Sequence, residues 1–598
     1  MFLRKNRKRF DGEIYEYWTL CESVRTERGP RQRVVASLGK FTDEDLEAGW
    51  DELEALLDGR RPAPRQSRLE GGAESAVEKP GWELADLSRL SVERVREFGR
   101  VFLALALWRR LGLHELLDEL IEPGREEIAW ADVAAVLTVG KFCGQVSELG
   151  IAEEWYARTA LEDLCGIPAE SVNDDRLYRA LDKVGAHKDR LCEHLMDRYR
   201  DWFGVTFEFL LYDVTSTYFE GQALKNEKAA RGYSRDSRGD CKQVCIGLVC
   251  TPDGLPLNFE VFAGNRADVT TVQEIVAKME ERFGQAERVW VMDRGMVSER
   301  NISYLRERKA LYIVGTPKSQ LCAFEAELAE QENWTDVQNG VEARLVEHPD
   351  GDGSECFVLC RSNARAAKER AMLERQMDRL SEELLKIDNS LRKRPQLDVE
   401  KVGRRIGRWQ GKYPSAAKWI EAKLVRDHQG RACGLRLCCP LPQRGHPLLA
   451  RGAYLLRTNC TETDPAKLWR WYIQLTQAEA AFRAAKSDIG LRPIYHHKSE
   501  RVEAHLLVCF LSLALWRTLE IWMSRHSLGT RAAKLVEAVG TIKSMDVTVP
   551  VKRGDRTVEL RLRTVAKPDK DVQILLANLD LRLPQGCKLV QNVVEKNC

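Results

Sequence analysis

Two aspartates stand at the ends of apolar runs that are typical of buried strands. Asp213 follows Leu210–Tyr212, and Asp293 follows Val289–Met292. Because the catalytic crevice of an α/β sheet forms at the carboxyl ends of its strands, we expect both carboxylates to lie there. Mg²⁺ prefers oxygen ligands, and two such ions about 4 Å apart can activate a water and stabilise the leaving oxygen of a phosphodiester. A turn or helix-cap role for either aspartate remains the alternative on spacing alone.

A third carboxylate belongs to a strongly helix-forming segment, residues 472–486. Within it Glu479, Arg483 and Lys486 follow one another at i, i+4 and i+7, which places all three on one face of a helix. The alternative interpretation is a weak surface ion pair between Glu479 and Arg483, exposed to solvent. Here the charged row precedes the apolar run Leu506–Trp516. A charged face close to a buried helix predicts a site.

An α/β core is predicted over residues 205–317, because strands and helices alternate there. The expected strands are residues 207–213, 244–250, 288–293 and 311–315, and the expected helices are residues 269–283 and 302–308. Residues 451–530, which are mostly helical, are expected to complete this core.

Residues 318–450 interrupt the alternation and predict an α+β insertion domain. A coiled-coil seam is indicated by apolar residues at 4-3-4-3-4 spacing, namely Leu373, Met377, Leu380, Leu384, Ile387 and Leu391. We expect this helix to fold back on residues 399–409, and residues 435–456 to be strand-like. A helical scaffold organised by the seam is a non-enzymatic alternative, but it leaves the strand-end aspartates unexplained.

The N-terminal part is predicted to bind DNA. Residues 1–58 are expected to form a basic β-hairpin and a short acidic helix over 43–57. Residues 1–40 hold ten Lys and Arg against five Asp and Glu, a local charge of +5. The phosphate-binding candidates are Arg4, Lys5, Arg7, Lys8 and Arg9. A solvated chain end is the alternative.

A linker and a second candidate DNA-binding unit follow. Residues 59–91 have no periodicity and predict a linker. Residues 92–204 predict a helical domain whose short helices could include a helix-turn-helix, with Asn173 as a helix cap. A bundle that merely packs is the alternative. Residues 531–598 form a tail with strand-like segments.

The composition of the 598 residues excludes several classes of protein. A hydrophobic content of 44% excludes global disorder. The apolar runs are too short for a membrane span, and no apolar signal-peptide core is present. The 17 cysteines are expected to be reduced cytosolic thiols. The sequence has no glycine loop of the phosphate-binding type, so ATP is not implied. The net charge of +2 does not exclude DNA, because the local distribution of charge matters more than its sum.

Taken together, these motifs resemble the bacterial insertion-sequence transposases of the DDE class, whose last carboxylate lies in a Tyr-(2)-Arg-(3)-Glu-(6)-Lys helix. Tyr472, Glu479 and Lys486 match that spacing, whereas Leu475 stands at the Arg position and Arg483 is the candidate replacement. Further matches run in the family's order over about residues 205–520: Asp213–Phe219, Gly264–Asp268, Met292–Met296, Leu456–Asn459 and Arg492–His496.

The resemblance implies an RNase H-like catalytic core interrupted by the insertion domain. Asp213 would lie on the first strand of that core and Asp293 on the fourth. Glu479 would lie on the helix after the insertion. The core would then comprise residues 205–317 and 451–530, with the insertion at 318–450.

The resemblance also implies a reaction. Asp213, Asp293 and Glu479 would hold two Mg²⁺ or Mn²⁺ ions and act in cleavage of transposon ends and transfer of the 3′-hydroxyl to target DNA. The implied DNA contacts are Tyr472, Arg483, Lys486, Arg294 and Lys318. The partners would be double-stranded terminal repeats and target DNA, without a membrane, and a homodimer could assemble on two ends in the bacterial cytoplasm and nucleoid.

Two related functions remain open on the sequence. A Mg²⁺-dependent nuclease of the same fold would cut DNA without joining it. An inactive DNA-binding derivative is disfavoured because all three carboxylates are present. His496 and His497 could approach the DNA, although a loop or core position is the simpler interpretation.

Overall fold

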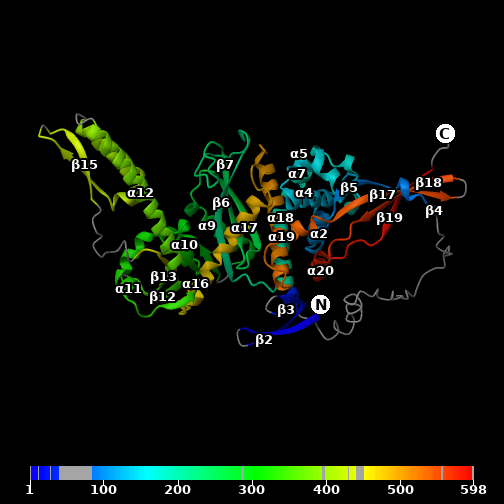
Figure 1. The fold of residues 1–598 in the computed structure, drawn as a ribbon, viewed down its shortest axis with the longest axis horizontal. Helices are drawn as coiled ribbons and strands as arrows, with labels where there is room; N and C mark the ends of the chain where they lie inside the picture. Colours follow the sequence, from blue (N-terminus) through cyan, green and yellow to red (C-terminus); the bar gives the residue numbers. More distant parts are fainter. Residues whose placement is uncertain are drawn as a thin grey trace.

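The computed structural model describes residues 2–10, 13–26, 29–39, 84–284, 288–349, 351–393, 398–428, 430–438, 450–553 and 556–594; the side chains of the N-terminal strands are not among what it describes. Within these ranges, nine strands form the central sheet in the order β11-β12-β13-β16-β10-β9-β6-β7-β8 (Figure 1). Their bounds are β6 Phe209–Tyr218, β7 Gln243–Cys250, β8 Pro256–Ala263, β9 Val289–Met292, β10 Leu311–Gly315, β11 Thr335–Gln338, β12 Val341–Val346, β13 Cys356–Ser362 and β16 Ala453–Thr458.

The middle of this sheet is parallel and deeply buried. β6 pairs with β9, and β9 pairs with β10, in parallel. Every residue of β7 and β9 is buried, which explains their continuous apolar runs. The predicted strands at 244–250, 288–293 and 311–315 are confirmed to within a residue or two. β8 was not predicted, since Asn258 and Glu260 interrupt its apolar pattern although both are buried.

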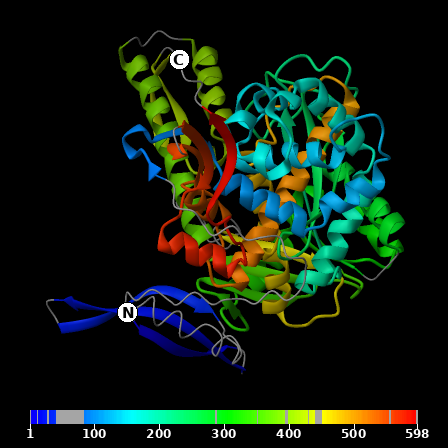
Figure 2. The ribbon, with the colours of Figure 1, turned by 90° about the vertical axis from the view of Figure 1, so that its right-hand side faces the viewer.

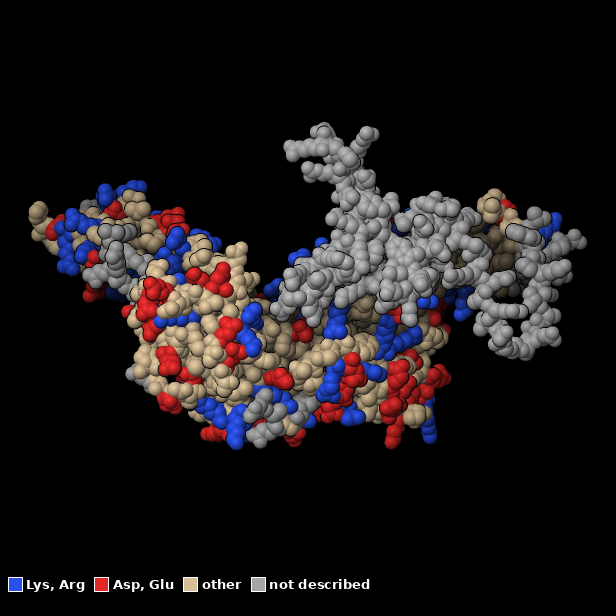
Figure 3. All heavy atoms as spheres, turned by 90° about the horizontal axis from the view of Figure 1, so that it is seen from below, with Lys and Arg blue, Asp and Glu red and all other residues tan. Residues whose placement is uncertain are grey.

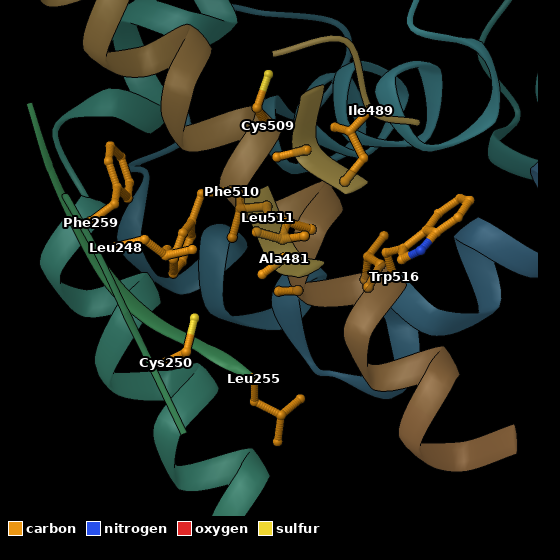
Figure 4. Packing of buried hydrophobic residues seen from close by; sticks show 14 of the residues in the cluster. Leu248, Cys250, Leu255, Phe259, Ala481, Ile489, Cys509, Phe510, Leu511 and Trp516 are labelled. Carbon is orange, nitrogen blue, oxygen red and sulfur yellow. The ribbon is translucent and has the colours of Figure 1, made fainter. Parts of the chain in front are cut away.

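Helices cover the faces of the sheet. α17 (Leu475–Ser487) packs on β6 and β7, and α18 (Ser499–Arg525) packs on α17 and β8. Figure 4 shows this core from close by, where Phe510 of α18 meets Phe259 of β8 with ring centroids 5.1 Å apart. The predicted helices near 269–283 and 302–308 are α9 (Val272–Phe283) and α10 (Glu299–Glu307).

The apolar run Leu506–Trp516, predicted to be too short for a membrane span, belongs to the longer helix α18, which by length and composition alone could cross a membrane. It is the one such helix in the described part of the chain. Its apolar window is 83% buried inside the molecule. It packs against α4 (Trp130–Gly144) and α7 (Asp174–Gly185) as well as the sheet. This burial on several sides explains its apolar sequence, as expected for a core helix.

The predicted helical region is present and packs onto α18. It consists of α2 (Gly99–Arg110), α3 (Leu113–Leu120), α4, α5 (Glu148–Gly150), α6 (Leu161–Cys165), α7 and α8 (Lys188–Phe203). The predicted cap is confirmed, because the Asn173 side chain accepts a 2.9 Å hydrogen bond from the Arg176 amide at the start of α7. Residues 91–97 are strand rather than helix.

The C-terminal tail is not a separate unit. β17 (Lys543–Arg553) pairs with β18 (Arg556–Val565), β18 pairs with β19 (Cys587–Val594), and β4 (Leu84–Ala85) and β5 (Ser91–Glu97) also pair with β17. α19 (Ala532–Val539) precedes β17 and packs on α2 and α18, and α20 (Lys570–Asn578) connects β18 to β19. The linker predicted over residues 59–91 therefore ends in strand.

The predicted insertion has two parts. Residues 335–362 extend the central sheet as β11, β12 and β13. The remainder forms an arm of α12 (Asn363–Lys393), α13 (Val399–Lys412), α14 (Pro414–Ala417), β14 (Glu421–Arg426) and β15 (Ala432–Cys438). The predicted seam is confirmed as an internal contact, since Leu380, Leu384, Ile387 and Leu391 are buried against Val402 and Ile406 of α13. Lys and Arg side chains, with acids among them, cover the arm at the left of Figure 3.

Among the N-terminal residues that the structure describes, three antiparallel strands form a sheet instead of the predicted hairpin (Figure 2). They are β1 (Phe2–Phe10), β2 (Glu13–Thr26) and β3 (Gly29–Gly39). The unpredicted strand is the basic segment itself, whose run of cations hides any alternation. The register sets Arg7 opposite Glu16. The predicted acidic helix over 43–57 lies outside the described residues.

Candidate active site

Asp213 lies within β6, and not at its end as predicted. β6 continues to Tyr218, paired with β7. Its parallel pairing with β9 stops at Tyr212 opposite Met292. Asp213 is therefore the first residue of β6 beyond this parallel pairing, and its half-buried side chain lies at the end of β9. The apolar run ends at Asp213 because the surroundings of the side chains change where the pairing with β9 stops. The strand itself continues to Tyr218.

Asp293 directly follows β9, as predicted, and precedes a short 3₁₀ turn, Arg294–Met296. Its side chain is exposed. The next strand, β10, ends at Gly315, and a Cβ placed there would be 3.2 Å from the Arg294 amide. The ends of β9 and β10 are therefore closely packed behind Asp293.

Glu479 lies on α17 and is also exposed. Asp213, Asp293 and Glu479 line one open pocket of about 230 Å³, together with Gly295 and Phe482. Two neighbouring strands and the helix packed on them bring together three carboxylates that are 80 and 186 residues apart in the sequence (293 − 213 and 479 − 293).

The pocket concentrates negative charge around Asp213. Burial, with the nearby carboxylates of Asp293 and Glu479, raises the pKa of Asp213 to about 6. The Val214 amide, which donates a 2.8 Å hydrogen bond to Asp213 Oδ1, and the guanidinium of Arg235 act in the opposite direction. A cation in the pocket would therefore stabilise the ionised form of Asp213.

Arg235 and Asp268 also line this pocket, although neither was predicted as a site residue. The Arg235 guanidinium forms an ion pair with the Asp268 carboxylate. Asp268 could have been found, since it ends the segment Gly264–Asp268 that resembles the family. Arg235 lies in the loop between β6 and β7, and no pattern in the sequence marks it.

The segment predicted as one helix is interrupted at Gln474. Tyr472 belongs to α16 (Pro465–Ile473), whereas Glu479 belongs to α17. The Thr476 hydroxyl donates a 2.7 Å hydrogen bond to the Ile473 carbonyl, a side-chain bond that bends helices. Tyr472 still lies near the site, since its hydroxyl and the Arg294 amide both lie beside Gly315, and burial with the nearby Asp293 raises the pKa of its phenol.

The basic residues of α17 differ in their surroundings. Arg483 is exposed. Lys486 donates a 3.0 Å hydrogen bond to Asp236, which also pairs with Arg492, and burial lowers the pKa of Lys486. Leu475, at the position where the resemblance calls for Arg, is buried in the core, so a guanidinium there would be buried too.

The other predicted contacts are dispersed. Arg294 is exposed beside Asp293. Lys318 pairs with Glu369 of α12 at 2.8 Å. The side chains of Arg4, Lys5, Arg7, Lys8 and Arg9 lie outside what the structure describes. His496 is buried and His497 is exposed.

Comparison with known proteins identifies the family. The family model of the transposase DDE domain matches residues 206–515, and that of the IS1634 family transposase N-terminal domain matches residues 3–68. No curated protein matches the chain. Among solved structures, a cryo-EM structure of a piggyBac transposase synaptic complex with hairpin DNA has a TM-score of 0.34 and 9% identity, over 74% of this chain and 79% of that one. The DDE domain covers more than half of the sequence, so the chain belongs to the DDE transposases of insertion sequences and is an enzyme that acts on DNA.

Proposed function

We propose that Asp213, Asp293 and Glu479 are the catalytic carboxylates of this transposase and that together they hold two Mg²⁺ or Mn²⁺ ions. The observation that carries the proposal is their convergence on one pocket. An all-carboxylate donor set suits hard divalent cations. The raised pKa of Asp213 supports it, because a bound cation would offset the mutual repulsion of the carboxylates.

In this proposal the enzyme cleaves the ends of its transposon and joins the freed 3′-hydroxyl groups to target DNA. When bound, the ions supply activation of the attacking oxygen and neutralisation of the leaving 3′-oxygen. The chain itself fixes the geometry. Asp213, within β6, and Asp293, after the end of β9, hold two carboxylates beside each other, and α17 carries Glu479 on the same pocket, so little reorganisation is needed when DNA binds.

The exposed cations around the pocket are proposed to hold the DNA backbone. Arg483 lies one helical turn beyond Glu479, and Arg294 follows Asp293 directly, so both can reach phosphates near the scissile bond. We propose that Lys486 acts partly through Asp236, which anchors the loop that carries Arg235. Tyr472, Lys318 and the cations of β1 would contact the backbone elsewhere.

The larger units have proposed roles as well. The N-terminal sheet and the helical region would bind terminal repeats of double-stranded DNA. Two chains would pair two ends in a homodimer, in the bacterial cytoplasm on nucleoid DNA. The arm would extend the DNA-binding surface, since Lys and Arg side chains gather on the face of it that Figure 3 shows.

Strand joining tests the proposed reaction against a nuclease of the same fold. Pre-cleaved transposon ends are supplied with a target plasmid and Mg²⁺, and joined products are counted. We expect joining that depends on the metal. Cutting of uncleaved ends with no joining of pre-cleaved ends would favour the nuclease.

Substitution of Asp293 tests the carboxylates. Asp293→Asn should abolish cleavage and joining and leave binding of the ends unchanged in a gel-shift assay. Asp201→Asn, an exposed aspartate at the end of α8, is the matched control and should leave both intact. Cleavage retained by Asp293→Asn would refute the metal-binding role of Asp293.

A further inference from the structure

A second group of metal-binding side chains lies apart from the catalytic pocket. Glu148 of α5, His496 of the segment before α18 and His505 of α18 bring one ligand atom each to within 4.8 Å of one another. All three are buried, with 4%, 9% and 3% of their surface exposed. None of them lines the pocket of Asp213, Asp293 and Glu479.

The distances between these atoms suit one shared ion. Glu148 Oε1 is 3.0 Å from His505 Nδ1 and 3.5 Å from His496 Nε2. Bonds of about 2.0–2.1 Å from a tetrahedral Zn²⁺ place neighbouring N and O donors roughly 3.3 Å apart. The three donors therefore surround a point at which a metal could bind with only small shifts.

One of the donors has no other partner. His496 Nε2 is buried and makes no hydrogen bond with any described residue, although its ring lies edge-on to Tyr178. A buried nitrogen without a partner is costly, and a metal bond would satisfy it. The pairing of two imidazoles with one carboxylate favours Zn²⁺ over Mg²⁺, which prefers oxygen alone.

The surroundings of the group also fit metal binding. On the far side of the His505 ring, Nε2 lies 3.7 Å from the Cys509 sulfur, an outer contact of the kind that orients a ligating imidazole. His496 also lines an open pocket of about 590 Å³, which gives an ion access from solvent.

Lys141 opposes a cation at this group of ligands. Its Nζ lies 3.8 Å from Glu148 Oε1, with 3% of the side chain exposed. Its ammonium group partly neutralises Glu148 and would compete with a metal for that carboxylate. Removing this charge should therefore strengthen metal binding, which is an effect that a purely structural network would not produce.

We propose that Glu148, His496 and His505 form a Zn²⁺ site that ties the helical region to the catalytic core, with the fourth position open to water. Glu148 belongs to the helical region, whereas the two histidines flank the start of α18, so the ion would link segments 348 and 357 residues apart (496 − 148 and 505 − 148). Such a link would stabilise the folded chain by an amount that grows with the logarithm of zinc affinity.

The test uses the full chain without an affinity tag, stripped with a chelator and kept in millimolar Mg²⁺ so that hard-cation sites are occupied. After addition of Zn²⁺ and dialysis, metal content is measured by mass spectrometry, and Co²⁺ is used as an absorption probe of coordination. We expect one retained Zn²⁺ per chain, a four-coordinate Co²⁺ spectrum and a raised melting temperature.

Variants locate the site. His505→Gln and Glu148→Gln should each lower zinc affinity at least about tenfold, whereas His497→Gln, the exposed neighbour, should not change it. Lys141→Met should raise the affinity. If His505→Gln fails to fold, the Co²⁺ spectrum of the unsubstituted chain decides whether a four-coordinate site exists. Absence of retained zinc and of a four-coordinate spectrum would overturn the proposal, as would equal zinc binding by the Glu148, His505 and His497 variants.

Discussion

The hydroxyl of Tyr472 lies against Gly315 so closely that a Cβ on that glycine would be 2.6 Å from the phenolic oxygen. The same Cβ would be 3.2 Å from the amide of Arg294, the residue after Asp293. The end of β10 therefore accepts only glycine if the aromatic ring of α16 and the end of β9 are to keep their places. This contact joins α16, the helix before the one that carries Glu479, to the end of β10, beside the turn that follows Asp293.

Gly315→Ala should impair catalysis more than stability. The added methyl group pushes either the Tyr472 ring or the backbone at Arg294, and both displacements move groups beside Asp293. We expect cleavage to fall at least tenfold, and overpacking to cost about 1–3 kcal/mol of unfolding free energy. Cleavage of a labelled transposon end and urea unfolding measure the two effects.

A second substitution separates this contact from a general effect of alanine. Tyr472→Phe removes the oxygen that the methyl group meets, so the Gly315→Ala/Tyr472→Phe protein should recover part of the lost cleavage. Gly403→Ala, on α13 where a Cβ meets no described atom within 4 Å, should leave activity unchanged. Full activity of Gly315→Ala would show that the contact does not position Asp293.

Asp213→Asn should inactivate the enzyme and stabilise the metal-free fold at neutral pH. The folded pKa of Asp213, about 6, lies above the ordinary value of 3.8 for an aspartate. The folded state therefore binds a proton more tightly than the unfolded state, and the unfolding free energy falls as pH rises from about 4 to 6, by up to about 3 kcal/mol. Asparagine carries no charge and avoids this loss.

Urea unfolding in a chelator checks this at both ends of the pH range. The variant and the unsubstituted chain should have similar stability near pH 4, and the variant should be the more stable one near pH 7. Added Mg²⁺ should narrow the difference by stabilising only the chain with Asp213. A variant that is less stable than the unsubstituted chain at pH 7 would mean that burial and the nearby carboxylates do not disfavour ionised Asp213 in the folded chain.

Asp236 is predicted to be essential for the loop that carries Arg235. It accepts from Lys486 at 3.0 Å, pairs with Arg492 and is 5% exposed. Asp236→Ala leaves two cations without their partner, so we expect a loss of about 3 kcal/mol in unfolding free energy together with reduced cleavage. Asp240→Ala, an exposed residue of the same loop, is the control and should change neither quantity. An unaltered midpoint in Asp236→Ala would show that the ion pairs contribute nothing to the fold.

The strands and carboxylates were predictable because their signals are local. Runs such as Val289–Met292 are buried on both faces, and the spacing of Glu479 from Lys486 is a property of one helix. The end of β6 could not be predicted, since Asp213 marks the end of pairing with β9 and not the end of the strand. Pairing of two strands depends on segments that are far apart in the sequence, so no local pattern shows where it stops.

The remaining site residues depend on tertiary contacts. Arg235 lies in a loop without periodicity, and its approach to Asp268 follows from how the loop is anchored through Asp236. Lys486 has the spacing of a surface cation, yet the fold buries most of it. Sequence spacing therefore predicted which face of α17 is charged, whereas the partners of that face required the three-dimensional structure.

Arg483 provides the last prediction, because it is exposed and its guanidinium has no partner among the described residues in the ion pairs and hydrogen bonds of the fold. Arg483→Gln should leave the midpoint of unfolding unchanged and weaken binding of every DNA end to a similar extent. Loss of one phosphate contact reduces the slope of log affinity against log salt by about 1. Arg582→Gln, an exposed arginine of the C-terminal tail, is the control and should keep the original slope. A change confined to one end sequence would instead indicate base recognition, and an unchanged slope would exclude Arg483 from the DNA interface.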